Sequence, residues 1–298
     1  MPSYAEILPL DDALRATYTA CVGIDDELAD LKKMAGINTA VTAVGTAAGA
    51  GATVVGIVKE RNDRKADQIK LKKLEKIAQY RIENNIKDPS DEDIANFVAH
   101  MTLSSTKETN AETELETLDR QSKKMGKWRT GLLAGNTATN VTGAIIASNN
   151  KVDDDLQTQI DNCKKAVDEL QRSMMQARFD GEDISEAQGI VNACKEYNYV
   201  DISPINKRAK GATISSLVGA TTGLTGTVTS AIANSDSVRN QGVGGTRTDK
   251  EKNLNTASNV LAGASTVASA TATVFNATQI KAIKDVASVA SKCTGVLK

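Results

Sequence analysis

The chain has 298 residues and an almost balanced charge, with 36 Lys and Arg against 37 Asp and Glu. This balance and an aromatic content of 3% argue against nucleic-acid binding, which usually requires a basic face and aromatic stacking platforms. His100 is the one histidine, so histidine-based metal binding or acid–base catalysis has little to use. The chain has only four prolines, which permits long uninterrupted helices.

The N-terminal segment, residues 1–59, predicts a coiled-coil arm that leads into a first small-residue helix. Its first twelve residues contain no apolar run, so we expect no secretory signal in this chain. After them, residues at alternating spacings of four and three form a narrow seam of the coiled-coil type: Leu10, Leu14, Thr17, Cys21, Ile24, Leu28 and Leu31.

Four stretches contain no Asp, Glu, Lys, Arg or His, and each predicts a long helix without charge on any side. They cover residues 34–58, 130–150, 211–235 and 253–280, with lengths of 25, 21, 25 and 28 residues. The sequence NTATNV at 136–141 returns as NTASNV at 255–260, which indicates either a degenerate internal repeat or biased composition alone.

Residues 60–110 predict a charged helical insertion. We expect a helix over 64–86 with an inward row made of Leu71, Leu74, Ala78 and Ile82. A shorter helix should begin after the cap residue Ser90 and run to about residue 101, followed by a loop over 102–111. Residues 111–150 then predict a helix that leads into the second small-residue helix.

Residues 151–203 predict a coiled-coil hairpin with a tight turn near 179–182. Its first arm carries the seam Leu156, Ile160, Cys163, Val167, Leu170 and Met174. The three acids Asp153, Asp154 and Asp155 suit either a helix N-terminus stabilised by the helix dipole or a cation site. We predict no metal site or cofactor.

The last segments are a third small-residue helix over 204–235, a flexible loop over 236–249, and a fourth small-residue helix with a C-terminal arm over 250–298. The loop is rich in Gly, Ser and Asn, which are turn-forming residues. The arm carries the seam Ile283, Val286, Ala290, Cys293 and Leu297. The chain as a whole is therefore predicted to be all-α.

The runs at 30–40 (DLKKMAGINTA) and 253–263 (NLNTASNVLAG) resemble a family of uncharacterised proteins from gut-associated alphaproteobacteria. The resemblance covers most of the chain except the variable region 60–120. Some relatives begin with a signal peptide, which implies export. The resemblance implies no activity.

The four cysteines all fall on heptad or helical core positions, either as buried thiols or as disulfides. Cys163 and Cys194 lie 14 to 16 residues either side of the turn near 179, which places them at one height in a hairpin. Cys21 lies 25 residues before the centre of the first stretch, and Cys293 lies 26 residues after the centre of the last. This symmetry predicts the disulfides Cys163–Cys194 and Cys21–Cys293, which would require an oxidising compartment.

The same centring predicts the topology. Stretches two and three, three and four, and one and four should be antiparallel. The result is an up-down-up-down bundle of four long small-residue-rich helices with coiled-coil arms and a helical insertion. Three Gly-x-x-x-Gly pairs predict tight helix contacts: Gly45 and Gly49, Gly131 and Gly135, and Gly219 and Gly223.

The pattern favours a non-enzymatic structural or self-assembling protein of the bacterial envelope or exterior, present as a homo-oligomer or filament. It contains no catalytic motif, and we expect no small-molecule substrate. A periplasmic, envelope or secreted location is expected, and a cytoplasmic one stays open. The alternative is a membrane-active, pore-forming or translocator-like protein with conditional membrane contact. The stretches are long enough to span a bilayer, but Leu, Ile, Val and Phe make up only 25 of their 99 residues.

Overall fold

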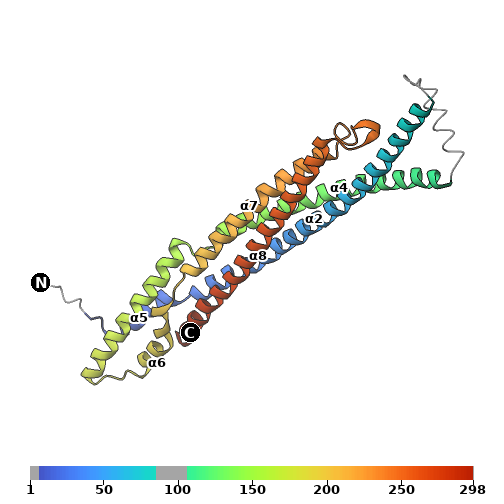
Figure 1. Cartoon of the computed structure of the whole chain (residues 1–298). Coiled ribbons are helices and arrows are strands. Elements are labelled where there is room, and N and C mark those ends of the chain that lie inside the picture. Colours follow the sequence, from blue (N-terminus) through green and yellow to red (C-terminus); the bar gives the residue numbers. More distant parts are fainter. Residues whose placement is uncertain (1–6, 85–105, 298) are drawn as a thin grey trace. The chain divides into compact units, whose positions relative to one another are not determined.

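The computed structural model describes residues 7–84 and 106–297, and these residues form helices joined by short connectors (Figure 1). The elements are α1 (Leu10–Cys21), α2 (Ile24–Glu83), α4 (Thr106–Asn149), α5 (Asp154–Asp180), α6 (Ser185–Cys194), η1 (Lys195–Tyr199), α7 (Ser203–Ala233), η2 (Val243–Gly245) and α8 (Asp249–Leu297). The predicted all-α class is confirmed.

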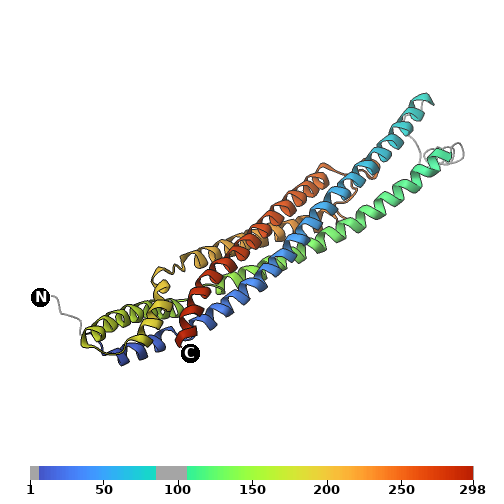
Figure 2. The same ribbon diagram turned by 90° about the horizontal axis from the view of Figure 1, so that it is seen from below.

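Helix α2 joins two elements that the sequence predicts as separate. It runs without a break from Ile24 through the first charge-free stretch to Glu83, inside the charged segment (Figure 2). The expected inward row is wrong at three positions, because Leu71 is 55% exposed, Ile82 is 78% exposed and Ala78 is also exposed. Helix α4 begins at Thr106, inside the expected loop over 102–111. The helix expected between Ser90 and residue 101, and His100 within it, lie outside the described residues.

The chain divides into two compact units, and all four long helices contribute to both. Unit 1 comprises residues 1–43, 141–216 and 270–298, and unit 2 comprises residues 44–140 and 217–269. Unit 1 therefore contains α1, α5 and α6 together with one end of each long helix. Unit 2 contains the other ends and the connector between α7 and α8.

The apolar core of unit 1 is built from the predicted heptad seams. The seam of α5 is buried at Leu156, Ile160, Cys163, Val167 and Leu170, and the seam of α8 at Ile283, Val286, Ala290 and Cys293. The N-terminal seam is also buried, but its helix is broken at Gly23, whose φ of +96° suits glycine alone. Ile24 restarts the seam in α2 at 0% exposure.

Side-chain contacts within each unit show the direction of the long helices. In unit 2, Asn136 of α4 meets Ser265 of α8, and Gly49 of α2 lies beside both Asn136 and Thr266. In unit 1, Asn38 of α2 pairs with Asn276 of α8. Ser258 and Ser265 of α8 donate to the carbonyls of Gly226 and Gly219 of α7, so α7 is antiparallel to α8. Together these contacts make α2 and α7 antiparallel to α4 and α8, which confirms the up-down-up-down order.

The ends of α5 follow ordinary capping chemistry. The Asp153 side chain accepts a hydrogen bond of 2.8 Å from the Leu156 backbone N–H, which caps the helix N-terminus. The helix ends at Gly181 with a φ of +78°, at the predicted turn. Of the two interpretations of Asp153–Asp155, the structure therefore supports the helix terminus.

Candidate functional site

The interior of the charge-free stretches combines polar side chains with small apolar clusters such as Ala52, Leu133 and Ala262. Asn136 donates to Ser265 at 2.7 Å and Asn140 donates to Ser269 at 2.8 Å, both in unit 2. In unit 1, Asn38 donates to Asn276 at 3.0 Å. All of these side chains are fully buried. Small hydroxyl and amide groups hydrogen-bonded to one another therefore occupy positions where a soluble bundle would carry Leu and Ile.

The exterior of the first and third stretches is largely apolar, whereas the second and fourth also expose polar residues: Thr142, Ser148, Asn149, Asn253, Thr256 and Thr271. In residues 34–58 every exposed residue is apolar: Met34, Ile37, Ala40, Ala43, Val44, Ala47, Ala50, Val54, Ile57 and Val58. The exposed residues of the third stretch are aliphatic except for Thr221 and Thr225. These two hydroxyls donate to the carbonyls of Leu217 and Thr221 in their own helix, at 3.1 and 2.9 Å. The outer surface of these two stretches therefore presents few polar groups that need a hydrogen bond from water.

The charge-free stretches end at a common level within each unit. In unit 2, Arg129 precedes the second stretch and donates to Ser230 near the end of the third and to Asn255 at the start of the fourth, at 3.0 and 2.8 Å. In unit 1, Gln279 near the end of the fourth stretch donates to the Asn150 carbonyl at the end of the second, at 2.6 Å. Within each unit, the charged residues of neighbouring helices therefore begin at about the same level.

Close helix packing occurs at four of the six predicted glycines. A Cβ at Gly49 would lie 2.5 Å from the Thr266 hydroxyl, and one at Gly219 or Gly223 would lie 2.6 Å from Asn140 or 2.7 Å from Thr137. A Cβ at Gly45 would collide with Thr139. Tight packing brings these backbones together so that the Asn and Ser side chains can reach across.

The prediction is wrong for Gly131 and Gly135. A Cβ at either position would meet nothing within 4 Å, because this face of α4 points outward. The sequence spacing alone does not tell which side of a helix faces its neighbours. It also misses Gly56, Gly126, Gly143 and Gly211, each of which lies against a neighbouring side chain.

This contrast gives a paired test. Gly49→Ala should destabilise the fold by about 1–3 kcal/mol, because Thr266 and Asn136 must move to admit the methyl group. Gly135→Ala should instead stabilise it by about 0.5–1 kcal/mol through helix propensity. Chemical denaturation of the two variants measures both effects. A stability gain at both positions would show that α2 and α8 are not in close contact.

A buried ion cluster lies at the charged end of unit 2. Lys59 pairs with Asp63 at 2.6 Å, and Asp63 also accepts a hydrogen bond from Ser122. Arg247 pairs with Glu60 and Asp67, each at 2.8 Å. The side chains of Lys59 and Arg247 are 1% and 3% exposed, so both depend on these partners.

Burial sets the ionisation of this cluster. Desolvation lowers the pKa of Lys59 despite the nearby Asp63 carboxylate. Desolvation also raises the pKa of Glu251, although it accepts a backbone hydrogen bond from Asn240. For Arg247, burial acts to lower the pKa, but the hydrogen bond to Asp67 and the surrounding acids outweigh it and raise the value. The cluster therefore holds Arg247 charged.

The same cluster anchors the connector between α7 and α8, which the sequence predicts as a flexible loop. Lys70 donates to the Gly245 carbonyl at 2.7 Å, and Arg239 donates to the Asp119 carbonyl at 2.7 Å. The Arg247 backbone N–H donates to Asp67 at 3.0 Å. The turn-rich composition predicts the irregular backbone correctly, but the side chains tie it to α2 and α4.

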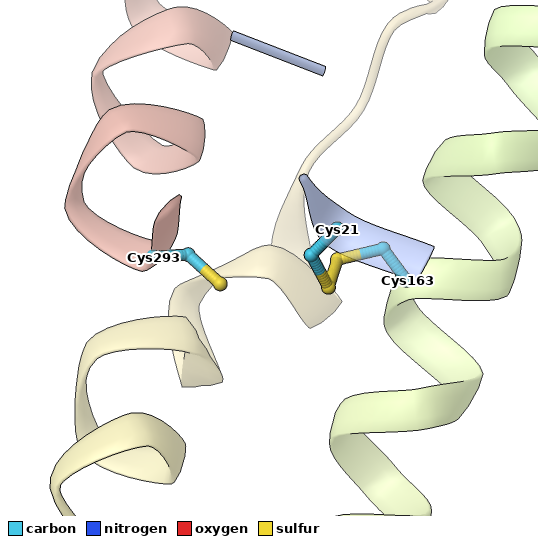
Figure 3. A group of neighbouring side chains, drawn as sticks. All are labelled: Cys21, Cys163 and Cys293. Atoms are coloured by element: carbon cyan, nitrogen blue, oxygen red, sulfur yellow. A yellow bond between two sulfur atoms is a disulfide. The ribbon is translucent and has the colours of Figure 1, made fainter. Parts of the chain in front are cut away.

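All four cysteines are in disulfides, but the predicted pairing is wrong. The bridges are Cys21–Cys163, which joins α1 to α5, and Cys194–Cys293, which joins α6 to α8. Spacing along the chain matches Cys163 with Cys194 and Cys21 with Cys293 in height, but it does not tell which helices are neighbours at the cysteines. Cys21, Cys163 and Cys293 have sulfurs within 4.8 Å of one another, and Figure 3 shows the Cys293 sulfur pointing toward the neighbouring bridge.

These three cysteine sulfurs lie close enough together to hold a metal ion. Among the described residues, no other set of three His, Cys, Asp or Glu side chains has such a spacing. Metal ligation by cysteine requires thiolates, and all three sulfurs are in disulfides, Cys21 with Cys163 and Cys293 with Cys194. The arrangement is therefore a pair of staples in the apolar core of unit 1.

Unit 1 has two shallow hollows on its surface. One, of about 440 Å³, is lined by residues of α7 and α8 with Arg208 and Asp285 among them. The other, of about 630 Å³, lies between α1 and α5 and contains Arg15 and Asp155. In the second hollow the Thr19 and Thr158 hydroxyls donate to backbone carbonyls of their own helices, so this lining does not support a catalytic assignment.

Two helical segments in the described part of the chain, Leu10–Glu83 and Val243–Leu297, are long and apolar enough by length and composition to cross a membrane. The core helix of a soluble protein can pass the same test, but it would be mostly buried. Here only 28% and 33% of the apolar windows are buried within the fold. Most of each window is therefore not buried within the fold.

Comparison with known proteins identifies no relative: no family model, curated protein or solved structure matches this chain. The resemblance carried by residues 30–40 and 253–263 therefore stays a prediction. Function has to be argued from the arrangement of side chains alone.

Proposed function

We propose that the protein is a non-enzymatic, membrane-embedded helical bundle, with its uncharged helices in the hydrocarbon layer. The observation that carries this proposal is the placement of Asn and Ser at buried positions of those helices and of Val, Ile and Leu at exposed ones. This develops the membrane-active alternative. The two disulfides further support a compartment that is oxidising, as in a bacterial envelope.

The free energy of the exposed aliphatic side chains depends on the solvent that surrounds the bundle. In water, the exposed aliphatic side chains would each forfeit part of the roughly 1.5–3 kcal/mol that burial of such a side chain contributes. In hydrocarbon they cost nothing, and helix association then relies on close packing and interhelical hydrogen bonds between small residues. The glycine contacts and the Asn–Ser pairs described above are of this kind.

The dimensions agree with a bilayer. A stretch of 25 residues spans about 37 Å as a helix, and the hydrocarbon core is about 30 Å thick. The low content of large apolar residues predicts poor insertion when the whole stretch is averaged. In the structure, most polar residues of the charge-free stretches are buried or donate a hydrogen bond to a carbonyl of their own helix.

Vesicle flotation tests the proposal. The purified chain should float with lipid vesicles and stay with them after an alkaline wash that removes peripheral proteins. The variant Val54→Lys/Val260→Lys places charge on two outward positions that are 60% and 66% exposed, and it should lose this retention. Gln68→Lys, on an exposed position of α2 beyond the charge-free stretch, is the matched control. Wild-type protein that stays in the aqueous fraction contradicts the proposal.

Self-association is a second candidate, supported by the outward glycines of α4. Gly131 and Gly135 present a Gly-x-x-x-Gly pair on an exposed face, with Ala134 between them. This is the spacing at which a helix of a second copy can approach closely. We expect Gly135→Leu to lower the oligomer size measured by native mass while helicity is kept. Ala47→Leu, on an exposed face of α2, should not change it.

A further inference from the structure

Exposed charges at the charged end of unit 2 are mostly basic. Within three turns of the charge-free stretches, α2, α4 and the start of α8 expose the following bases, here called the basic collar: Arg61, Arg64, Lys65, Arg120, Lys123, Lys124, Lys127, Lys250 and Lys252. The exposed acids of the same segments and the connector are Asp236 and Asp249.

This imbalance arises because the fold sorts charge by sign. The acids of this region point inward, where Glu60, Asp63 and Asp67 surround Arg247. Glu251 is 1% exposed, and the Asn240 backbone N–H donates to it at 2.7 Å. Three collar bases have an acid nearby at the surface: Arg64 with Glu60, Lys123 with Asp236 and Lys252 with Asp249. Such exposed pairs are weak, so the outer surface is left with a positive excess.

The corresponding charged end of unit 1 has no such excess. Its exposed bases, such as Lys32, Lys33 and Lys210, are matched by exposed acids, such as Asp30 and Asp154. The basic surface is therefore a property of unit 2. It is also local, because the distal part of α4 exposes Glu112, Glu114 and Glu116.

An exposed Trp128 marks the edge between the collar and the charge-free stretch of α4. Its side chain is 60% exposed. It directly follows Lys127 and lies two residues before residue 130, where the charge-free stretch begins. Tryptophan is enriched at the level of lipid headgroups, where its apolar ring and polar N–H are both accommodated. Lysines just beyond that level can reach the phosphates.

We propose that the basic collar binds the phosphates of anionic phospholipids and thereby sets the level at which unit 2 meets the bilayer surface. This inference rests on the proposed membrane function and names the lipid class. The collar bases come from three helices and adjoin the apolar exterior, which suits a bilayer surface. Trp128 is the one aromatic residue there, whereas single-stranded nucleic acid would require several stacking platforms.

The test compares binding of the full chain to neutral phosphatidylcholine vesicles and to vesicles that also contain phosphatidylglycerol. The proposal expects a preference for the anionic vesicles of about tenfold or more at low salt, falling at high salt. The triple variant Lys123→Gln/Lys124→Gln/Lys127→Gln should lose most of the preference. These side chains are exposed, so its helicity by circular dichroism should match the wild type.

The matched control is Lys32→Gln/Lys33→Gln/Lys210→Gln, which removes three exposed lysines from unit 1 and should keep the preference. Equal binding of wild type to both vesicle types, or an unchanged preference in the collar variant, overturns the collar and leaves the membrane function standing. Binding to neither vesicle type removes the membrane function and the collar with it. Tighter binding to DNA than to anionic vesicles also overturns the proposal.

Discussion

Reduction of the two disulfides is expected to destabilise unit 1 by several kcal/mol and to leave unit 2 largely unaffected. The bridges span 142 and 99 residues, and loops of this length are each worth about 5 kcal/mol in the chain-entropy model. Both lie in the core that α1, α5, α6 and α8 share. Hydrogen exchange with and without a reductant should therefore show lost protection in α1, α5 and α6 and retained protection in residues 44–70.

Two double variants separate the contributions of the two disulfides to the stability of unit 1. Cys21→Ser/Cys163→Ser should loosen α1 from α5, while Cys194→Ser/Cys293→Ser should loosen α6 from α8. Each should cost less than full reduction. Peptide mapping without reductant checks the pairing directly. Recovery of Cys163–Cys194 or Cys21–Cys293 as the main pairs would contradict the arrangement.

The burial of the cysteines could be predicted from the sequence, but their pairing could not. Heptad spacing correctly places Cys21, Cys163 and Cys293 in buried seams, because a narrow apolar stripe can be satisfied only by packing against another element. Partner choice depends on which helices are neighbours around that level. The break at Gly23 shows that a continuous seam does not guarantee a continuous helix, since the apolar spacing survives a turn.

The charge-free stretches give a second lesson. Their position, length and mutual direction could be predicted, because charge blocks and turn residues are visible along the chain. Their polarity could not, since Asn, Thr and Gly at short intervals leave no dominant apolar side. Only the packing shows that Asn38 and Asn136 face inward while Val44 and Val54 face outward. That distinction decides which environment the helices require.

Arg247→Met is expected to destabilise unit 2 by about 3–5 kcal/mol. Its guanidinium is nearly fully buried and lies between three carboxylates, with Glu60 and Asp67 at 2.8 Å and Asp63 at 3.7 Å. Removal of the cation leaves these acids without their main counter-charge, and an uncompensated buried charge is costly. The variant should also free the connector between α7 and α8, so hydrogen exchange of residues 236–248 should accelerate.

Arg64→Met is the matched control, because Arg64 also pairs with Glu60 at 3.0 Å but is 72% exposed. Its loss should cost no more than about 1 kcal/mol, as for other surface pairs. The double variant Arg247→Met/Asp67→Asn should recover part of the stability, since it removes one of the crowded acids. Equal effects of Arg247→Met and Arg64→Met in chemical denaturation would show that water reaches the cluster. The inward sorting of acids would then fail as the cause of the basic surface around unit 2.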